Sequence, residues 1–411
     1  MLPRILLLLC SILAISVARE QFLSPIPPPS QEVVKLDTKQ CGKSCLEELF
    51  YNDYPFSFMA NFLANPKAYK DEELTKKFKD LAAEILDFTP DYLPKVTITA
   101  PRIALLIPQK SIGRYSASSA DSILAYLITR GVDFSFKVFD SVDESPQNLS
   151  RTYSEIEKQG FDYAVAIITS KGLESLLANS KISTPLFVPT VSKAQISQDL
   201  PIEGVVFGGL DYGKQISMLV NLAASKQAGI ISYNDDSPIG RMLGELVASR
   251  AQNLLSSEAI DSKKAAKFSD HINKARKNLK TSIVILNTSA NKSGVIVPQI
   301  GSAKLLPIAF LSPQVNYNPY LLRLLQREDA KKIFVVSAIG SIPPNLIAFS
   351  DLLSADLQYD WVNYATALAI DLMLEGEGGR LFTEVIEDQQ VLYNDRFYGI
   401  RDGHFVPMDP R

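Results

Sequence analysis

Side chains able to hold a small polar molecule recur just after short β-branched runs of the sequence. Hydroxyl groups can bind a carboxylate by hydrogen bonding, and an acidic side chain can pair with an ammonium group. The same residue types also cap helices, because their oxygens accept the first free N–H groups of a helix. For each candidate, ligand binding and helix capping are therefore alternative roles. The candidates are Ser111, Tyr115, Ser116, Thr169, Ser170, Thr190, Ser192, Asn234, Asp235 and Asp236.

Catalytic and metal chemistry finds little support in the residue types. Only two histidines, His271 and His404, and three cysteines occur in 411 residues, too few for an ordinary zinc or haem site. The sequence has no G-x-S-x-G, H-E-x-x-H or Walker A motif. We therefore expect a protein that is not an enzyme, with no catalytic residue, no metal and no cofactor.

The charge balance argues against a polyanionic partner. The 42 basic and 45 acidic side chains give a formal charge of −3, and we identify no basic stripe along the sequence. Without such a stripe, nucleic acid is not expected as a partner. With 46% hydrophobic residues, the chain can bury at least one large core.

The N-terminus has the layout of a secretory signal peptide. Arg4 precedes an apolar run over residues 5–17, and the small residue Ala18 ends it. We expect residues 1–18 to be removed by cleavage after Ala18. The run is shorter than the roughly 20 residues that a membrane-spanning helix needs, and no later stretch replaces it, so no transmembrane helix is expected in the mature chain. A lipidated Cys10 is the alternative, disfavoured by the bulky Leu9 before it.

Cys41 and Cys45 are the two cysteines left after that cleavage. An exported chain enters an oxidising compartment, in which an even number of cysteines usually pairs. A redox or metal site would need a C-x-x-C spacing or a second ligand pair, and neither is present. We predict a disulfide between these two residues.

The rest of the chain divides by pattern into a tether, a helical segment and a long α/β region. Residues 19–39 include FLSPIPPPS, whose four prolines favour an extended tether. Residues 40–95 carry apolar side chains at helical spacing, such as Leu74 and Phe78, and predict a small helical segment. From residue 101 on, β-branched runs alternate with amphipathic helical stretches. This alternation predicts parallel sheets with right-handed crossovers, and its length predicts two α/β lobes.

Four segments resemble the type I periplasmic binding fold, which is found in branched-chain amino-acid receptors. One of them, residues 268–286, resembles a later helix and strand of that fold. Residues 102–131 (RIALLIPQKSIGRYSASSADSILAYLITRG) are similar to that fold's opening strand, serine-rich loop and first helix. Residues 228–251 (AGIISYNDDSPIGRMLGELVASRA) resemble the first strand, acidic loop and helix of its second lobe. Residues 357–373 (LQYDWVNYATALAIDLM) resemble its tyrosine-bearing helix. Taken in order, the resemblance spans residues 101 to about 400.

The resemblance implies an α/β fold of two doubly wound parallel-sheet lobes, preceded here by the short helical segment. Three crossover segments join the lobes, which close on a ligand held at the C-terminal ends of strands from both. Thr190 and Ser192 match the serine-alanine-threonine position of the family. The implied first lobe comprises residues 101–207 and 338–378, and the second comprises residues 208–337 and 379–411.

Two functions follow as hypotheses. The first is a periplasmic solute-binding protein that closes on a small polar ligand, amino-acid-like or acidic, and delivers it to an ABC transporter of the inner membrane. The second is an interaction module with a degenerate cleft, which regulates an envelope complex such as peptidoglycan synthesis. The resemblance implies this alternative because the family includes the C-terminal domain of outer-membrane lipoproteins that activate peptidoglycan synthases, where a helical domain precedes the fold.

Five other residues bear on these hypotheses. Lys110, Lys171 and Lys193 adjoin three of the loops where the receptors have small residues. They favour an acidic ligand or the loss of the ligand, unless they simply point to water.

Asn287-Thr-Ser matches the glycosylation sequon, which is common by chance. Trp361 lies on an amphipathic helix, and we expect it in the core.

Overall fold

The computed structural model describes residues 41–86 except 53, 64 and 66, residues 100–374 except 114 and 132, and residues 380–410. The chain forms two compact units, Met1–Ile98 and Thr99–Arg411. The predicted signal peptide and the predicted tether both lie outside the described residues. Within the described ranges, no helix is both long enough and apolar enough to cross a membrane.

The first unit contains three short α-helices whose apolar stripes meet. The helices are α2 (Lys43–Tyr51), α3 (Pro55–Leu63) and α4 (Glu72–Leu86), with the 3₁₀ turn η1 (Ala68–Lys70) before α4. The rings of Phe62 and Phe78 stack with their centroids 4.8 Å apart. At the start of α2, Cys41 and Cys45 are joined by a disulfide with an S–S distance of 2.01 Å, as predicted. The buried core residues include Leu46, Phe58, Phe62, Leu74 and Phe78.

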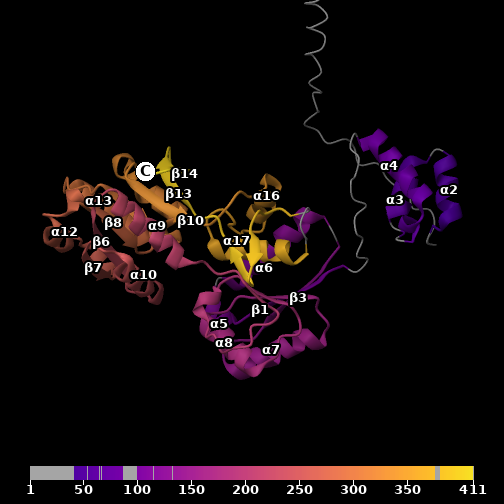
Figure 1. Cartoon of the computed structure of the whole chain (residues 1–411), viewed down its shortest axis with the longest axis horizontal. Coiled ribbons are helices and arrows are strands. Elements are labelled where there is room, and N and C mark those ends of the chain that lie inside the picture. The colour runs from indigo at the N-terminus through magenta and orange to yellow at the C-terminus, as the bar shows by residue number, and fades with distance from the viewer. Residues whose placement is uncertain are drawn as a thin grey trace, which may run out of the picture. The chain divides into compact units, whose positions relative to one another are not determined.

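The second unit contains two seven-stranded sheets, one in each lobe (Figure 1). All strand pairs are parallel except at one edge of each sheet. There β11–β12 of the first sheet, and β10–β13 and β13–β14 of the second, are antiparallel. The first sheet has the order β11 (Val385–Glu387), β12 (Gln390–Leu392), β5 (Val205–Phe207), β4 (Leu186–Val188), β3 (Tyr163–Ala166), β1 (Arg102–Ile107) and β2 (Ser135–Asp140). The second has the order β14 (His404–Pro407), β13 (Arg396–Arg401), β10 (Ile333–Ser337), β9 (Ala309–Ser312), β8 (Ser282–Asn287), β6 (Gly229–Asp235) and β7 (Leu254–Ile260).

Helices cover both faces of each sheet, so the predicted α/β class with two doubly wound lobes is confirmed. The helices of the first lobe are α5 (Gln109–Ile112), α6 (Tyr115–Arg130), α7 (Pro146–Lys158), α8 (Ser170–Asn179), α16 (Pro344–Leu352) and α17 (Trp361–Leu374). Those of the second are α9 (Tyr212–Ser225), α10 (Pro238–Arg250), α11 (Ser262–Ala266), α12 (Ser269–Ala275), α13 (Ala290–Ser302), α14 (Pro319–Leu324) and α15 (Arg327–Ala330). The 3₁₀ turns are η2 (Lys193–Gln195), η3 (Leu279–Thr281) and η4 (Gln314–Asn316).

The central strands are apolar on both sides because both sides are buried. Successive side chains of a strand point to opposite faces. In β1, Leu106 packs with the cluster of α7 and α8, whereas Leu105 packs with the cluster of α6 and α17. In β6, Ile230 packs with α9 and α10, and Ile231 with α12 and α13. A continuous apolar run is typical of a parallel strand covered on two faces.

Three segments connect the lobes: residues 208–211, 338–343 and 393–395. The implied lobe division differs from the sheets at its last boundary. We assigned residues 379–411 to the second lobe, but β11 and β12 extend the first sheet, since β12 pairs with β5. Only β13 and β14 join the second sheet. A short hairpin gives little sequence signal about the sheet edge to which it is added.

Candidate functional site

A cavity of about 590 Å³ lies between the lobes, at the C-terminal ends of β6 and β8 and in the loop after β9. We call it the cleft. From the first lobe, its wall takes Tyr115 at the start of α6 and residues 360–362 at the start of α17. From the second lobe, it takes residues 287–289 at the end of β8, and residues 314, 315, 317 and 318 after β9. Ligands of open α/β sheets bind at this end of the strands, so the location suits a binding site.

Aromatic side chains form much of the cleft wall. The half-buried Tyr115 and Tyr212 come from opposite lobes, and burial together with the neighbouring Tyr115 raises the pKa of Tyr212. The ring of Trp361 lies edge-on to that of Tyr393, with centroids 4.7 Å apart. Large rings of this kind offer flat contact area to a bound molecule. The aromatic residues that line the cleft are Tyr115, Tyr212, Tyr317, Tyr359 and Trp361.

In the second lobe, two carboxylates next to the cleft share one lysine. Lys292 on α13 lies 3.1 Å from Asp235 Oδ2 and 2.6 Å from Asp236 Oδ1. Burial by itself raises the pKa of Asp235, but hydrogen bonds from Ser237 N–H, from Lys292 and from Ser289 N–H outweigh it, and the pKa lies below its usual value. Burial lowers the pKa of Lys292, and its two carboxylate partners raise it overall. The acid that we expected to hold an ammonium group already has a cation.

Asn234 lies beneath the cleft wall and supports it. Its Oδ1 accepts from Asn287 Nδ2 at 2.8 Å and from Ser232 Oγ at 2.8 Å, and its Nδ2 donates to Ser257 Oγ at 2.9 Å. Asn287, which matched the glycosylation sequon, is 2% exposed and is therefore inaccessible as an acceptor in the folded chain. The amide network fixes the ends of β6 and β8 relative to each other.

Two predicted threonines of the first lobe serve its own architecture. Thr169 caps α8 by accepting the N–H of Gly172 at 3.2 Å, and its hydroxyl donates to Glu144. Thr190 Oγ1 donates to the carbonyl of Ile168 at 2.6 Å. Neither residue lines the cleft.

The three predicted serines at positions 111, 116 and 170 also lie off the cleft wall. Ser111 is exposed on α5, and Ser170 is the half-buried first residue of α8. The hydroxyl of Ser116 is buried without a hydrogen-bond partner in the described part of the chain. Of the ten predicted residues, the structure thus brings Tyr115 and Asp235 into the cleft wall, and it places Asp236 beside Asp235.

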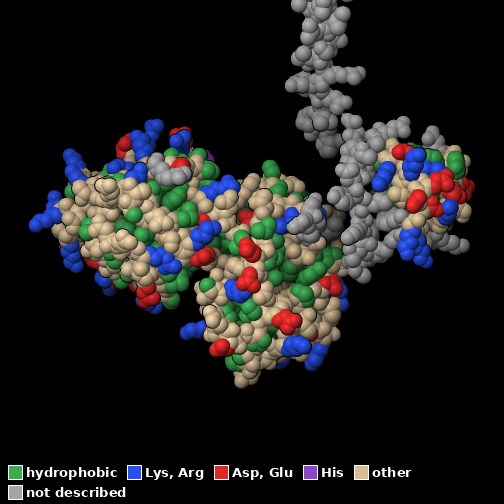
Figure 2. All heavy atoms as spheres, in the orientation of Figure 1, with side chains coloured by type: hydrophobic (Ala, Val, Ile, Leu, Met, Phe, Trp, Pro, Cys, Tyr) green, Lys and Arg blue, Asp and Glu red, His purple; other side chains and the backbone are tan. Residues whose placement is uncertain are grey.

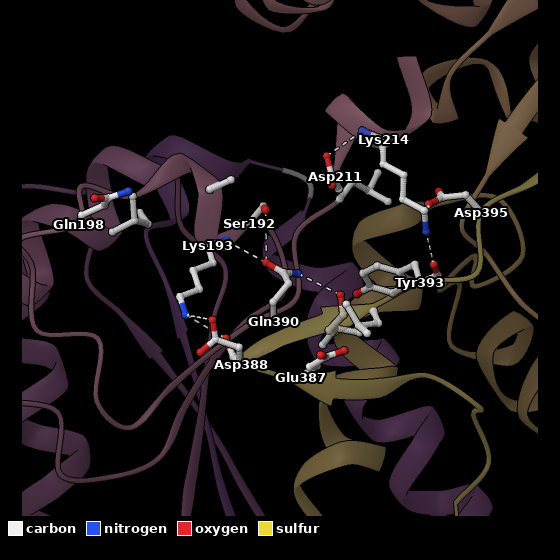
Figure 3. A pocket seen from close by; sticks show the side chains of 15 residues that line it. Ser192, Lys193, Gln198, Asp211, Lys214, Glu387, Asp388, Gln390, Tyr393 and Asp395 are labelled. Atoms are coloured by element: carbon white, nitrogen blue, oxygen red, sulfur yellow. Dashed lines mark hydrogen bonds and ion pairs between the residues drawn. The ribbon is translucent and has the colours of Figure 1, made fainter. Parts of the chain in front are cut away.

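Ser192 belongs to a second cavity, of about 540 Å³, beside the crossover segments (Figure 3). Gln390 Oε1 accepts there from Ser192 Oγ at 3.2 Å and from Lys193 N at 2.8 Å. Lys193 Nζ lies 2.7 Å from Asp388 Oδ2. These bonds tie the loop after β4 to the β11–β12 hairpin within the first lobe, and they place Ser192 next to the crossover segments rather than in the cleft.

Buried amides connect two of the crossover segments with the cleft. Gln215, fully buried on α9, donates to Asp395 Oδ1 at 2.7 Å and accepts from Gln314 N at 3.0 Å. Gln314 Oε1 in turn accepts from Ala338 N at 2.8 Å. Because Gln314 also lines the cleft, a ligand that contacts it would act on a residue bonded to the hinge.

The first crossover segment is closely packed against the loop after β4. A Cβ added at Gly209 would lie 2.2 Å from Ser192 N, so only glycine fits this position. Tyr393 of the third crossover donates its hydroxyl to Gly208 O at 2.6 Å. The three crossovers are therefore bonded to their surroundings rather than exposed as free linkers.

The sequence analysis missed most of the aromatic cleft wall. Trp361, which we expected in the core, is half-buried at the N-terminal end of α17 and lines the cleft. Tyr317 and Asn287 follow β-branched runs just as the chosen candidates do, and that position was the signal available for them. Lys292 gave no signal, because its pairing with Asp235 depends on the fold. No group of three or more His, Cys, Asp or Glu residues in the described ranges is arranged to hold a metal ion.

Three solved structures illustrate what this chain is similar to. The branched-chain amino-acid ABC transporter protein of Thermus thermophilus with bound valine aligns with a TM-score of 0.56 and 13% identity over 76% of this chain and 96% of that one. The ABC transporter substrate-binding protein of Sphaerobacter thermophilus aligns with a TM-score of 0.57 and 12% identity over 75% and 96%. Haemophilus influenzae LpoA aligns with a TM-score of 0.50 and 13% identity over 88% and 67%.

These alignments agree with the sheet orders, and the two lobes have the type I periplasmic binding fold. The expected fold is thereby confirmed. No protein-family model matches the chain, and no curated protein sequence matches it. At 12–13% identity the similarity shows the fold and leaves the ligand to be argued from the cleft.

Proposed function

We propose that the two-lobed unit binds a small neutral ligand with a flat ring in the cleft and closes its lobes on it, without catalysing a reaction. The observation that supports this most is the cleft wall, in which five aromatic side chains from both lobes lie among hydroxyl and amide groups. A mainly apolar, aromatic cavity with a few polar groups is typical of small-molecule sites. Rotation about crossover segments is the usual way for two such lobes to close.

The charges favour a neutral ligand over the amino-acid-like or acidic ligand that the sequence suggested. Asp235 is already paired with Lys292 in the same lobe. Lys110 and Lys171 are exposed outside the cleft, and Lys193 pairs with Asp388 of the same lobe, also outside the cleft. Asp360, which also lines the cleft, accepts the N–H groups of Val362 and Asn363 at the start of α17. A charged ligand would have to compete with these existing bonds and with the ion pair, which costs free energy.

We further propose that the protein is exported to the periplasm and presents its ligand to an ABC transporter. The N-terminal pattern ending at Ala18 and the disulfide between Cys41 and Cys45 support export. The Thermus thermophilus and Sphaerobacter thermophilus structures support delivery, because both are named as ABC transporter proteins. The transporter itself is not specified by any residue pattern.

A second candidate function rests on the helical unit, which the proposed cleft does not use. Tyr51, Tyr54 and Phe56, where α2 meets α3, are 70%, 58% and 45% exposed. Exposed aromatic residues are enriched at protein interfaces. The alignment with Haemophilus influenzae LpoA covers 88% of the chain, more than the two lobes alone. This arrangement supports the alternative that the protein regulates an envelope complex, such as the one that synthesises peptidoglycan.

A ligand screen separates the two candidates. Thermal-shift assays on the mature chain would compare neutral compounds with a flat ring, such as aromatic amides, with amino acids, small acids and peptidoglycan fragments. A ligand at 100 times its dissociation constant stabilises the fold by about 2.7 kcal/mol. We expect the hits among the neutral ring compounds. Hits confined to charged compounds, or no hit at all, would contradict the cleft proposal, and the second result would favour the interaction module.

Matched tyrosine variants then locate the site by calorimetric titration. Tyr115→Ala removes a ring from the cleft wall, whereas Tyr163→Ala removes a half-buried tyrosine from the start of β3, at the opposite ends of the strands. Stacking of one ring contributes about 0.5 to 1.5 kcal/mol, so Tyr115→Ala should weaken binding up to about tenfold. Tyr163→Ala should leave the affinity unchanged. Equal affinities for the two variants would place the ligand elsewhere.

A further inference from the structure

The second lobe carries a strongly basic surface, although the whole chain is nearly neutral. Residues 263–280 contain seven basic side chains and one acidic side chain, Asp270. All seven are exposed, and Figure 2 shows basic side chains along the edge of the lobe that carries α12. This local excess corrects our expectation that no basic stripe interrupts the charge balance. We call it the basic face. It comprises Lys263, Lys264, Lys267, Lys274, Arg276, Lys277 and Lys280.

The amphipathic pattern of this segment orients the cations outward. Phe268, Ile272, Ala275 and Leu279 follow one another at spacings of three or four residues, and all four are buried in the core of the lobe. Lys274, Arg276 and Lys277 lie between them on the exposed side, while the other four basic residues flank the pattern at its two ends. The same helical turns that complete the hydrophobic core therefore gather positive charge on the outside.

Most of this charge is not compensated within the protein. In the described part of the chain, the side chains of Lys267, Arg276, Lys277 and Lys280 form neither an ion pair nor a hydrogen bond. Lys274 approaches Glu258 at 3.8 Å, but that carboxylate is closer to His271, at 2.6 Å. Clustered like charges repel each other and attract anions from solution. The basic face is thus complementary to a surface of negative charge.

The side chains around these cations favour a lipid surface over other anions. Phe268 and His271, the segment's aromatic residues, are 0% and 7% exposed, so none is available for stacking on bases. Six of the seven cations are lysines, which are depleted at protein–protein interfaces. Clusters of about four to eight Lys or Arg residues bind anionic lipids by charge alone, at roughly 1 kcal/mol per residue.

A shallow cavity of about 410 Å³ lies within the basic face, between α12 and α13. Arg276 lines it together with the polar side chains of Ser269, Asn273 and Ser302. A guanidinium beside hydroxyl and amide groups is well suited to a phosphate oxygen. The cavity can therefore receive a lipid headgroup while the lysines around it face the bilayer.

We propose that the basic face binds the surface of an anionic phospholipid bilayer without inserting into it. The test uses the full mature chain and sedimentation with two kinds of vesicle, phosphatidylcholine alone and phosphatidylcholine with about 30% phosphatidylglycerol. The chain should bind only the anionic vesicles, and high salt should abolish the binding. Binding to neutral vesicles, salt-resistant binding or no binding to either kind would overturn the proposal.

Charge-reversal variants assign the binding to this face. Replacing Lys267, Lys277 and Lys280 with Glu should lower the partition coefficient at least about 100-fold, because each lysine contributes about fivefold. Replacing the same three with Gln should give an intermediate loss and guards against misfolding of the Glu variant. The control replaces Lys171 and Lys181 of the first lobe with Glu; both are exposed, and the control should bind as the wild type does.

Two outcomes of this series would refute the assignment to the basic face. One is an equal loss of binding in the control variant, which would mean that only the total charge matters. The other is binding to double-stranded DNA, an acidic polysaccharide or an acidic protein in the absence of binding to anionic vesicles. Thermal midpoints of all variants confirm that each chain is folded.

Discussion

The strand ends of the two lobes carry similar polar residues but use them differently. In the first lobe, Thr169 caps α8 and Thr190 holds the carbonyl of Ile168, so these hydroxyls stabilise their own lobe. In the second lobe, Asp235 lies in the cleft wall and is held there by Lys292. The first lobe instead contributes rings to the cleft. One lobe thus supplies mainly aromatic surface, and the other supplies most of the polar groups.

The difference shows how one topology can serve two purposes. Parallel strands deliver the residues after them to the same edge of a sheet in both lobes. Whether such a residue caps a helix or contacts a ligand depends on what packs against it. Substitutions in the two lobes should therefore change stability and ligand affinity by different amounts.

The largest effect is expected at Lys292 in the second lobe. Lys292→Met removes the cation of Asp235, which is 9% exposed, and leaves a buried carboxylate without a charged partner. Breaking a buried pair in this way costs about 3 kcal/mol of unfolding free energy. Urea denaturation measures the loss, with Lys181→Met, at an exposed position of the first lobe, as the control. A loss below about 1 kcal/mol would show that the pair behaves as a surface salt bridge.

A smaller effect is expected at the hinge between the lobes. Gln215→Leu leaves the N–H of Gln314 without its partner and removes a donor from Asp395. An unsatisfied buried group costs about 1 to 3 kcal/mol, so we expect a loss of about 2 kcal/mol in denaturant unfolding. The same variant should alter ligand affinity, since Gln314 lines the cleft. A change in stability with unaltered affinity would show that this hydrogen-bond network does not influence ligand binding in the cleft.

In the first lobe, Thr190→Val should affect folding alone. The substitution removes the hydrogen bond from Oγ1 to Ile168 O and conserves most of the side-chain volume. We expect a loss of about 1 kcal/mol in unfolding free energy and no change in ligand affinity. The reverse pattern, in which affinity falls and stability stays constant, would indicate that Thr190 contacts the ligand.

The smallest effect is expected in the pH dependence of stability, through Asp143 in the first lobe. Hydrogen bonds from the Ser145 hydroxyl, the Asn148 amide and the Ser145 N–H lower the pKa of Asp143 from 3.8 to about 2. A carboxyl whose pKa is lower in the folded state stabilises the fold above its unfolded pKa, and the stabilisation is lost as the pH falls through the folded value. The wild type should therefore lose more stability than Asp143→Asn between about pH 4 and about pH 2. Parallel losses in the two chains would exclude this contribution.

The sequence predicted the architecture more fully than the site. The apolar runs of β1 and β6 and the amphipathic helices between strands were sufficient for two α/β lobes, because burial on both faces leaves a continuous pattern. Asp235, the last residue of β6, was placed at the strand end from the sequence, and it lines the cleft. Its partner Lys292 was not predicted, because the pair joins residues far apart in the chain.

For Trp361, the sequence pattern predicted the core, whereas the structure places the residue in the cleft wall. Its helical spacing with Tyr364 and Leu368 predicted a core residue, and those two are indeed fully buried. A helical pattern identifies the buried face of a helix but not what lies beyond its end. At the first turn of α17, the neighbour of Trp361 is the cleft.

The position of Trp361 provides the most direct test of the binding cleft. It is the only tryptophan in the sequence, so the emission of the protein reports on the cleft wall. Titration with a ligand from the screen should change this emission saturably, with the dissociation constant found by calorimetry. Tyr115→Ala should shift the midpoint of the change up to about tenfold. A ligand that stabilises the fold but leaves the emission of Trp361 unchanged would contradict binding in the cleft.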